Sequence, residues 1–176
     1  MSLQTPKLFN PDEGEHYAFL NTRSTIRVSG ADSGGVLTVI ELLAPRGFGP
    51  PLHSHQVEDE LFHVTEGALW VSCGGQEQVL EVGGTAWLPK GLPHTFQAVG
   101  PQTTRVLQIT TPAQFEDFTR ALGAPMSHAG LPDPVQIDPG EVARVCAEFR
   151  IDVLGPPPAP LDDAVGGSMG GPSASQ

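Results

Sequence analysis

Two glycine-punctuated blocks constrain this chain most, because they place three histidines and a glutamate at short, defined intervals. The first block runs from Gly47 to Gly67 and contains His53, His55 and Glu60. The second block runs from Gly83 to His94. Imidazole and carboxylate groups together form a mixed nitrogen and oxygen ligand set that suits divalent transition metals. The spacing therefore predicts a mononuclear metal site.

Strand geometry supports two of these ligands directly and leaves the third open. Side chains alternate between the faces of a strand, so His53 and His55 point the same way. Glu60 lies five residues beyond His55, an odd offset that requires a break in the strand after His55. Glu58 shares the parity of Glu60 and is a rival carboxylate ligand, and Asp59 is a weaker rival.

The segment around these blocks reads as short strands separated by turns. The chain of 176 residues contains 21 glycines and 18 prolines, which all-β architectures use in their turns. Close and even spacing of strands predicts a sandwich or barrel, and closure of that barrel would bring His94 to the other ligands. The expected strands are 25–28, 36–43, 61–65, 68–73, 78–82, 85–88, 94–99 and 105–110.

The C-terminal third has a different character. Thr111 followed by Pro112 predicts the start of a helix that continues to about Leu122. Asp138 followed by Pro139 predicts a second helix that ends near residue 150. We therefore expect a β-domain over residues 1–111, a helical segment packed on the barrel over 112–154, and a flexible tail rich in proline, glycine and serine over 155–176.

Composition excludes several classes of partner. The formal net charge of -11 and the lack of a basic patch argue against a nucleic acid. No apolar run is long enough to cross a bilayer, and the first twelve residues do not resemble a signal peptide. Cys73 and Cys146 fit no ligand spacing and are expected to be reduced thiols. These features predict a cytoplasmic protein without a membrane partner.

The three histidines outside the two blocks are expected at the surface. His63 has the opposite strand parity to Glu60 and should face outward, where a dimer contact is one possible role. His16 and His128 are expected in loops.

Taken together, the two blocks resemble the two sequence motifs of the cupin family. The first block matches the family pattern at Gly47, His53, His55, Glu60 and Gly67. The second matches at Gly83, Pro89, Gly91 and His94. The second departs at Ala98, where the family pattern has Asn. The resemblance covers residues 36–109 and implies a jelly-roll barrel, or double-stranded β-helix, that forms a homodimer. It assigns the metal ligands to His53, His55, Glu60 and His94.

A closer likeness connects the chain with single-domain quercetin (flavonol) dioxygenase-like cupins. It rests on the His-Ser-His order, the acidic run from Glu58 to Glu60, and the start of a phenylalanine-bearing helix at Thr111. This resemblance implies one divalent transition metal per chain: iron, manganese, nickel, cobalt, copper or zinc. It further implies dioxygen and a small aromatic substrate as partners. Glu60 would be both a metal ligand and the catalytic base that takes the substrate's hydroxyl proton.

The predicted pocket is apolar. Phe62 shares the inward parity of Glu60, Phe96 shares that of His94, and Phe48 lies near the expected mouth, so all three are candidate substrate-binding residues. Alternatively, Phe62 and Phe96 belong to the barrel core. A metal-dependent dioxygenase is the favoured function. A non-catalytic metal-binding or small-molecule-binding module or sensor is the alternative, and a sugar isomerase or epimerase ranks lower because sugar sites need more polar groups.

Overall fold

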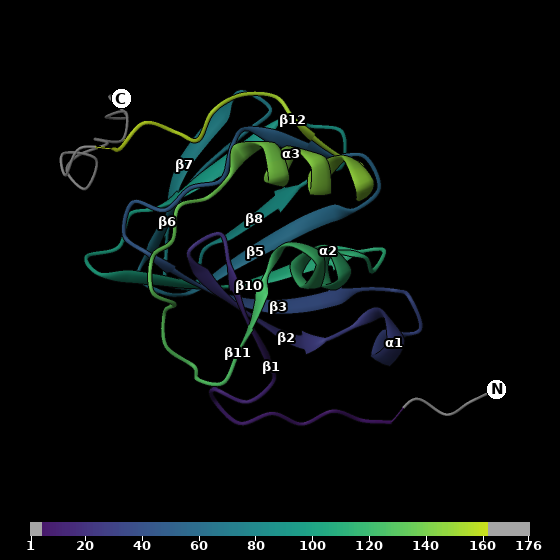
Figure 1. Ribbon diagram of the computed structural model, residues 1–176. Coiled ribbons are helices and arrows are strands. Elements are labelled where there is room, and N and C mark those ends of the chain that lie inside the picture. The colour runs from purple at the N-terminus through teal and green to yellow at the C-terminus, as the bar shows by residue number, and fades with distance from the viewer. Residues whose placement is uncertain (1–4, 162–176) are drawn as a thin grey trace, which may run out of the picture.

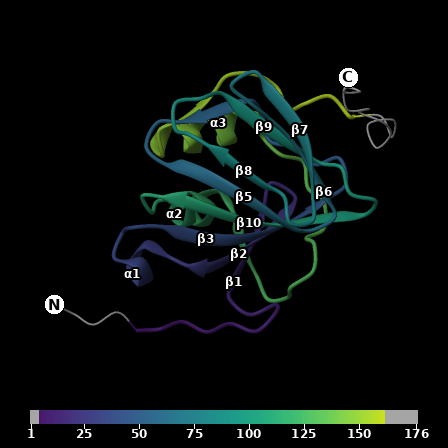
Figure 2. The same cartoon turned by 180° about the vertical axis from the view of Figure 1, so that it is seen from behind.

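Two antiparallel sheets face one another and enclose a barrel, as the computed structural model of residues 5–161 shows (Figures 1 and 2). Within these residues, one sheet has seven strands in the order β11-β1-β2-β3-β10-β5-β8, and the other has five in the order β12-β4-β9-β6-β7. This architecture confirms the expected all-β jelly-roll barrel. The larger sheet contains β1 (Glu15–Phe19), β2 (Thr22–Val28), β3 (Thr38–Pro45), β5 (Asp59–Glu66), β8 (Thr85–Leu88), β10 (Thr103–Thr111) and β11 (Ala124–Met126). The smaller contains β4 (His53–His55), β6 (Ala68–Cys73), β7 (Gln76–Glu81), β9 (His94–Ala98) and β12 (Ile151–Val153).

Strand alternation builds the barrel core, and β5 shows it most clearly. Glu60, Phe62 and Val64 are buried on its inner face, whereas Leu61 and His63 are only half-buried. His63 faces outward as predicted, and its ring contacts the Thr85 hydroxyl at 3.0 Å. The core between the sheets consists of apolar residues from both: Leu42, Phe62, Val64, Leu69, Val71, Leu80, Leu88, Phe96 and Val106.

Several strand boundaries differ from the prediction. The strand expected from Val36 begins at Thr38, because Val36 lies in the exposed turn before it. Strands β1, β11 and β12 were not predicted, since strands of three to five residues carry little sequence signal. His16 consequently lies in β1 and not in a loop, with its ring against the Thr25 hydroxyl and the Asp12 carbonyl. His128 lies in an exposed loop, as expected.

The sequence predicted two helices in the C-terminal third, and the structure contains both, although one begins later than expected. A further short helix, α1 (Gly30–Ser33), was not predicted. Helix α2 (Phe115–Leu122) begins three residues later than expected, because Thr111 is still the last residue of β10. Helix α3 (Pro139–Glu148) begins as predicted, with the Asp138 carboxylate accepting a hydrogen bond from the Gly140 N–H. Within residues 5–161, no helix combines the length and apolarity needed to cross a membrane.

Helices α2 and α3 form a second apolar core with the larger sheet. Helix α2 contacts β1 and β3, and α3 contacts α2 and β12 (Figure 1). The helices therefore close one side of the barrel. The residues of this second core are Phe19, Ile26, Ile40, Phe115, Phe118, Val142, Val145, Cys146 and Ile151.

Residues 155–161 contact the barrel, although the sequence places them in a flexible tail. The Leu52 N–H donates to the Pro156 carbonyl at 3.2 Å. The Gln97 side chain donates to the Ala159 carbonyl at 3.3 Å and accepts from the Leu161 N–H at 3.0 Å. Residues 162–176 lie outside the described residues, so the flexible tail stays a prediction for them. Both cysteines are free thiols, as expected.

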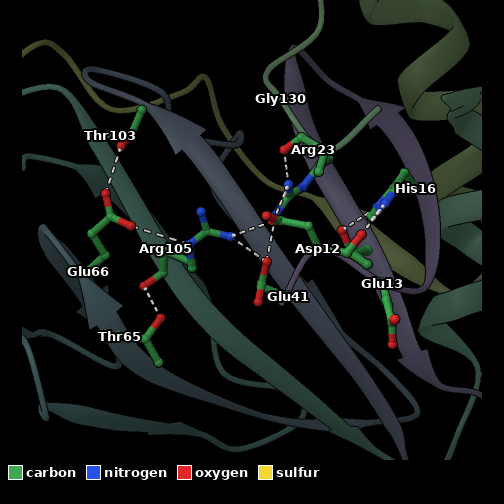
Figure 3. Close-up of polar contacts among 12 residues, drawn as sticks. Asp12, Glu13, His16, Arg23, Glu41, Thr65, Glu66, Thr103, Arg105 and Gly130 are labelled. Carbon is green, nitrogen blue, oxygen red and sulfur yellow. Dashed lines mark hydrogen bonds and ion pairs between the residues drawn. The ribbon is translucent and has the colours of Figure 1, made fainter. Parts of the chain in front are cut away.

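A polar network on the outer face of the larger sheet centres on Glu41 (Figure 3). Its carboxylate contacts Arg23 at 2.5 Å, Arg105 at 2.6 Å and Arg27 at 3.0 Å. The side chain of Arg23 is 0% exposed, and Asp12 lies 3.5 Å from it. Burial lowers the pKa of Arg23, whereas Glu41 opposes that shift. The network joins three neighbouring strands and the segment that precedes β1.

Gly67, the last glycine of the first block, occupies a backbone conformation that disfavours other residues. Its φ is +74°, and a Cβ there would lie 2.4 Å from the Thr103 carbonyl oxygen. We expect Gly67→Ala to lower the free energy of unfolding by more than the ~1–2 kcal/mol that left-handed backbone alone costs an L-residue. Urea unfolding measures the change.

Gly75→Ala is the matched control for this prediction. Gly75 has a similar φ of +81°, but nothing lies within 4 Å of a Cβ at that position. It therefore carries the backbone cost without the clash. Equal losses of stability in the two variants would contradict a role for the close approach at Gly67.

Candidate metal centre

The predicted metal ligands come together from both sheets. His53 and His55 lie on β4, His94 lies on the adjacent β9, and Glu60 lies on β5 of the opposite sheet. Their four ligand atoms all lie within 4.8 Å of one another. Residues 56–58 carry the chain from one sheet to the other, which is the break that the odd offset of Glu60 requires. The cluster could hold a metal ion.

The corner formed by residues 89–93 of the second block is bound to the first block through its backbone. The Gly91 N–H donates to the His55 carbonyl at 2.7 Å. The Lys90 N–H donates to the Asp59 carboxylate at 2.9 Å. Asp59 therefore fixes the corner and is not a member of the cluster. These bonds fix the segment that leads into β9, and with it His94, beside β4.

Two of the imidazoles are oriented by backbone carbonyls. His53 Nδ1 lies 2.8 Å from the Pro51 carbonyl, and His94 Nδ1 lies 2.9 Å from the Leu92 carbonyl. Because a carbonyl can only accept, Nδ1 carries the proton in both rings. The Nε2 lone pairs are thereby left for the cluster. Burial, reinforced by His94 and His55, lowers the pKa of His53 to about 3, so its ring is neutral near pH 7, as a metal ligand must be.

The third imidazole has a carboxylate partner in place of a carbonyl. His55 Nδ1 lies 3.1 Å from Glu58 Oε1. Burial alone would lower the pKa of His55, but Glu58 and Glu60 outweigh that effect and raise it. Glu58, the rival ligand in the sequence, thus contacts a histidine from behind and does not join the cluster. The shared parity of Glu58 and Glu60 could not show this, because Glu58 lies in the segment that connects the two sheets, whereas Glu60 lies on β5.

Glu60 is held in a defined orientation. The Gln108 side-chain amide donates to Glu60 Oε1 at 2.5 Å, and Oε2 lies 3.3 Å from His94 Nε2. Burial favours the neutral acid, but the contact with His94 and the neighbouring rings of His55 and His53 lower the pKa of Glu60 to about 2. The side chain is therefore a carboxylate at neutral pH. Gln108 was not identified from the sequence, where it is one polar residue in a β-strand.

The buried atoms of the cluster fit a metal. His55 Nε2, His94 Nε2 and Glu60 Oε2 are buried and make no hydrogen bond to any other described group. Buried polar atoms are almost always satisfied, so three unsatisfied acceptors that converge on one point fit a bound cation. Neutral imidazoles and one carboxylate form the mixed donor set of a transition metal.

A small apolar cavity of about 60 Å³ adjoins the cluster. Phe48 and Phe96 line it, as proposed for the pocket, whereas Phe62 is fully buried and packs against Phe96 with ring centroids 4.9 Å apart. Helices α2 and α3 supply part of the wall, through Phe115, Phe118, Val142 and Cys146. The sequence did not identify these helical residues as wall residues, because their place in the wall depends on where the helices dock.

A larger hollow of about 550 Å³ lies directly outside this cavity. Its lining is mainly apolar and includes prolines from the segment before β4 and from residues 155–157. The two spaces share six lining residues, which are Leu20, Phe48, Pro50, Pro51, Val142 and Val153.

Comparison with known proteins agrees with this geometry. Residues 39–110 match the family profile described as "Cupin domain". A quercetin 2,3-dioxygenase of Bacillus subtilis is 28% identical over 72% of this chain, and one of Aspergillus japonicus is 33% identical over 54%. The chain covers only 37% and 29% of the length of these two relatives.

Among solved structures, an RmlC-like cupin of Shewanella frigidimarina superposes with a TM-score of 0.52 at 20% identity. The match covers 66% of this chain and 99% of that one, and it supports the fold alone. The shared profile, the fold and the two motif blocks agree: residues 39–110 form a cupin domain, and the chain is similar to quercetin 2,3-dioxygenases.

Proposed function

We propose that this protein is a metal-dependent dioxygenase that acts on a flavonol-like or related enolic aromatic. The observation that carries the proposal is the buried set of unsatisfied ligand atoms at the inner end of an apolar cavity. In this proposal His53, His55, Glu60 and His94 are the metal ligands, and Glu60 is also the catalytic base. Similarity to two quercetin 2,3-dioxygenases supports the choice of reaction.

The size of the two spaces suggests how such a ligand would be placed. The inner cavity of about 60 Å³ holds only a few atoms, whereas pockets for drug-sized ligands usually measure ~300–1,000 Å³. An aromatic substrate would therefore extend from the cluster into the outer hollow of about 550 Å³. Phe48 and Phe96 would contact its rings, and Phe62 would act by supporting Phe96.

Glu60 is arranged to move a proton. Gln108 occupies its Oε1, so Oε2, which faces the cluster, would both hold the metal and accept the proton of a substrate hydroxyl. A metal held by the cluster supplies Lewis-acid stabilisation of the negative charge that remains on the substrate oxygen. Dioxygen is the oxidant: its O–O bond and a carbon–carbon bond of the substrate would break, and two new C–O bonds would place both oxygen atoms in the products. Glu60 would return its proton to a product, so the carboxylate is regenerated.

The lining of the cavity argues against the sugar isomerase or epimerase. A sugar needs several convergent hydrogen-bonding groups, but apart from the cluster the polar side chain at the inner cavity is that of Gln108, which already serves Glu60. A cytoplasmic homodimer remains part of the proposal, and sedimentation velocity tests the oligomeric state.

Elemental analysis and oxygen uptake test the proposed function together. We expect about one transition metal per chain, and oxygen consumption with a flavonol panel after the chelated protein is reloaded with each of the six candidate metals in turn. Aldose and ketose sugars serve as control substrates. Metal binding and a ligand-induced thermal shift without oxygen uptake would instead support the non-catalytic module. A protein that binds no metal would contradict both.

A further inference from the structure

We propose that Glu58 is a positioning residue, which orients His55 toward the metal and links the metal centre to the C-terminal segment 139–153. The inference rests on the metal-binding part of the proposed function and not on the dioxygenase reaction. Glu58 is 1% exposed, and the described residues place no lysine or arginine against it. A carboxylate in such a place is costly unless a specific partner requires it.

That partner is His55. The two atoms that face each other, His55 Nδ1 and Glu58 Oε1, are 3.1 Å apart, and neither hydrogen bonds to another described group. His53 and His94 orient the same ring atom with neutral carbonyls. A carboxylate acceptor makes the opposite nitrogen a stronger donor to a metal and fixes the ring's tautomer. The three imidazoles are therefore not equivalent.

The other oxygen of Glu58 is connected to the C-terminal segment through the side chain of Gln114. The Gln114 side-chain amide lies 3.3 Å from Glu58 Oε2 and also donates to the Phe149 carbonyl at 2.9 Å. Phe149 is the residue that follows α3. One amide group thus connects a carboxylate behind a metal ligand with the end of a helix.

The backbone makes a parallel connection to the same segment. Strand β12 pairs with β4, so that Ile151 lies opposite His55 and Val153 opposite His53. The Gln56 N–H donates to the Arg150 carbonyl at 3.0 Å. Helix α3 and β12 also form part of the cavity wall. Metal binding at His55 should therefore stabilise that wall, and an ordered wall should in turn favour metal binding.

Metal affinity of the full-length protein tests the role of Glu58. We expect Glu58→Gln and Glu58→Met to raise the dissociation constant for Co²⁺, measured by chelator competition, by ~10–100-fold, the usual cost of losing such a partner. The visible absorption spectrum of bound Co²⁺ should also change. Glu116→Gln is the matched control: Glu116 is also buried, at 4% exposed, but its carboxylate accepts from the Gly30 N–H and the Thr38 hydroxyl and not from the cluster.

Hydrogen exchange of the wild-type protein and of one variant tests the link. Addition of Co²⁺ should slow exchange in peptides that span residues 149–153, and this protection should be reduced in Gln114→Leu. Glu58 variants with wild-type affinity and an unchanged spectrum would overturn the inference, even if their melting temperatures fell. Unchanged exchange on metal addition would overturn the link. A wild-type protein that binds no Co²⁺ would overturn this inference and the proposed function together, whereas metal binding without oxygen uptake would leave the inference standing.

Discussion

Replacing Glu60 with glutamine is expected to lower turnover of a flavonol substrate by roughly 10²–10⁴-fold, the usual contribution of a positioned general base. The amide has nearly the same shape, so the Gln108 contact can be kept. It cannot, however, accept a proton from a substrate hydroxyl. The amide is also a weaker ligand than a carboxylate, so metal affinity should fall as well. Oxygen uptake at saturating metal separates the two effects, because turnover per bound metal then reports on the base alone.

His63→Gln is the control for that experiment. His63 lies on the same strand as Glu60 but on its outer face, where its ring contacts the Thr85 hydroxyl. We expect its metal content and turnover to match the wild type. Full turnover per bound metal in Glu60→Gln would remove Glu60 as the base and would leave it as a ligand only.

The shared face of His53 and His55 could be predicted from the sequence because it depends on local periodicity, whereas the full set of four candidate ligands is what the family resemblance implies. Residues two apart on a strand share a face whatever the rest of the fold is, so the common direction of His53 and His55 could be predicted without knowing the fold. Glu60 was less secure, because parity carries no information across residues 56–58, where the chain changes sheets. The structure shows why two carboxylates in one acidic run have different surroundings: Glu60 belongs to β5, whereas Glu58 lies before it, behind His55.

The walls of the pocket could not be predicted in the same way. Phe115 and Val142 lie on helices whose apolar stripes show that they are buried, but not against which part of the barrel. That depends on β12, a three-residue strand whose pairing with β4 is a long-range contact without a local signal. For the same reason the sequence predicted only that the helices pack on the barrel. It predicted a pocket with its mouth near Phe48, but not that the helices form part of the pocket wall.

Replacing Glu41 with glutamine is expected to destabilise the fold by about 3–5 kcal/mol, the usual cost of removing one partner from a buried ion pair. Glu41 contacts three arginines, and the fully buried Arg23 would lose its closest carboxylate. Asp12, at 3.5 Å, would remain as the weaker partner. Urea unfolding followed by circular dichroism measures the loss. It should appear as a lower midpoint with an unchanged slope, because the surface exposed on unfolding stays the same.

Glu66→Gln is the matched control for the Glu41 experiment. Glu66 contacts Arg105 at 3.3 Å, but its side chain is 55% exposed, so its loss should cost less than about 1 kcal/mol. The pH dependence adds a second check. Burial raises the pKa of Glu41, but Arg27 and Arg105 outweigh it and lower the pKa below its ordinary value of 4.5. The stability that Glu41 contributes is therefore complete above that value and is lost as the pH falls through its lower pKa in the folded protein. The difference between wild type and Glu41→Gln should shrink over the same range, and a difference that is constant with pH would show that the loss arises from packing and not from charge.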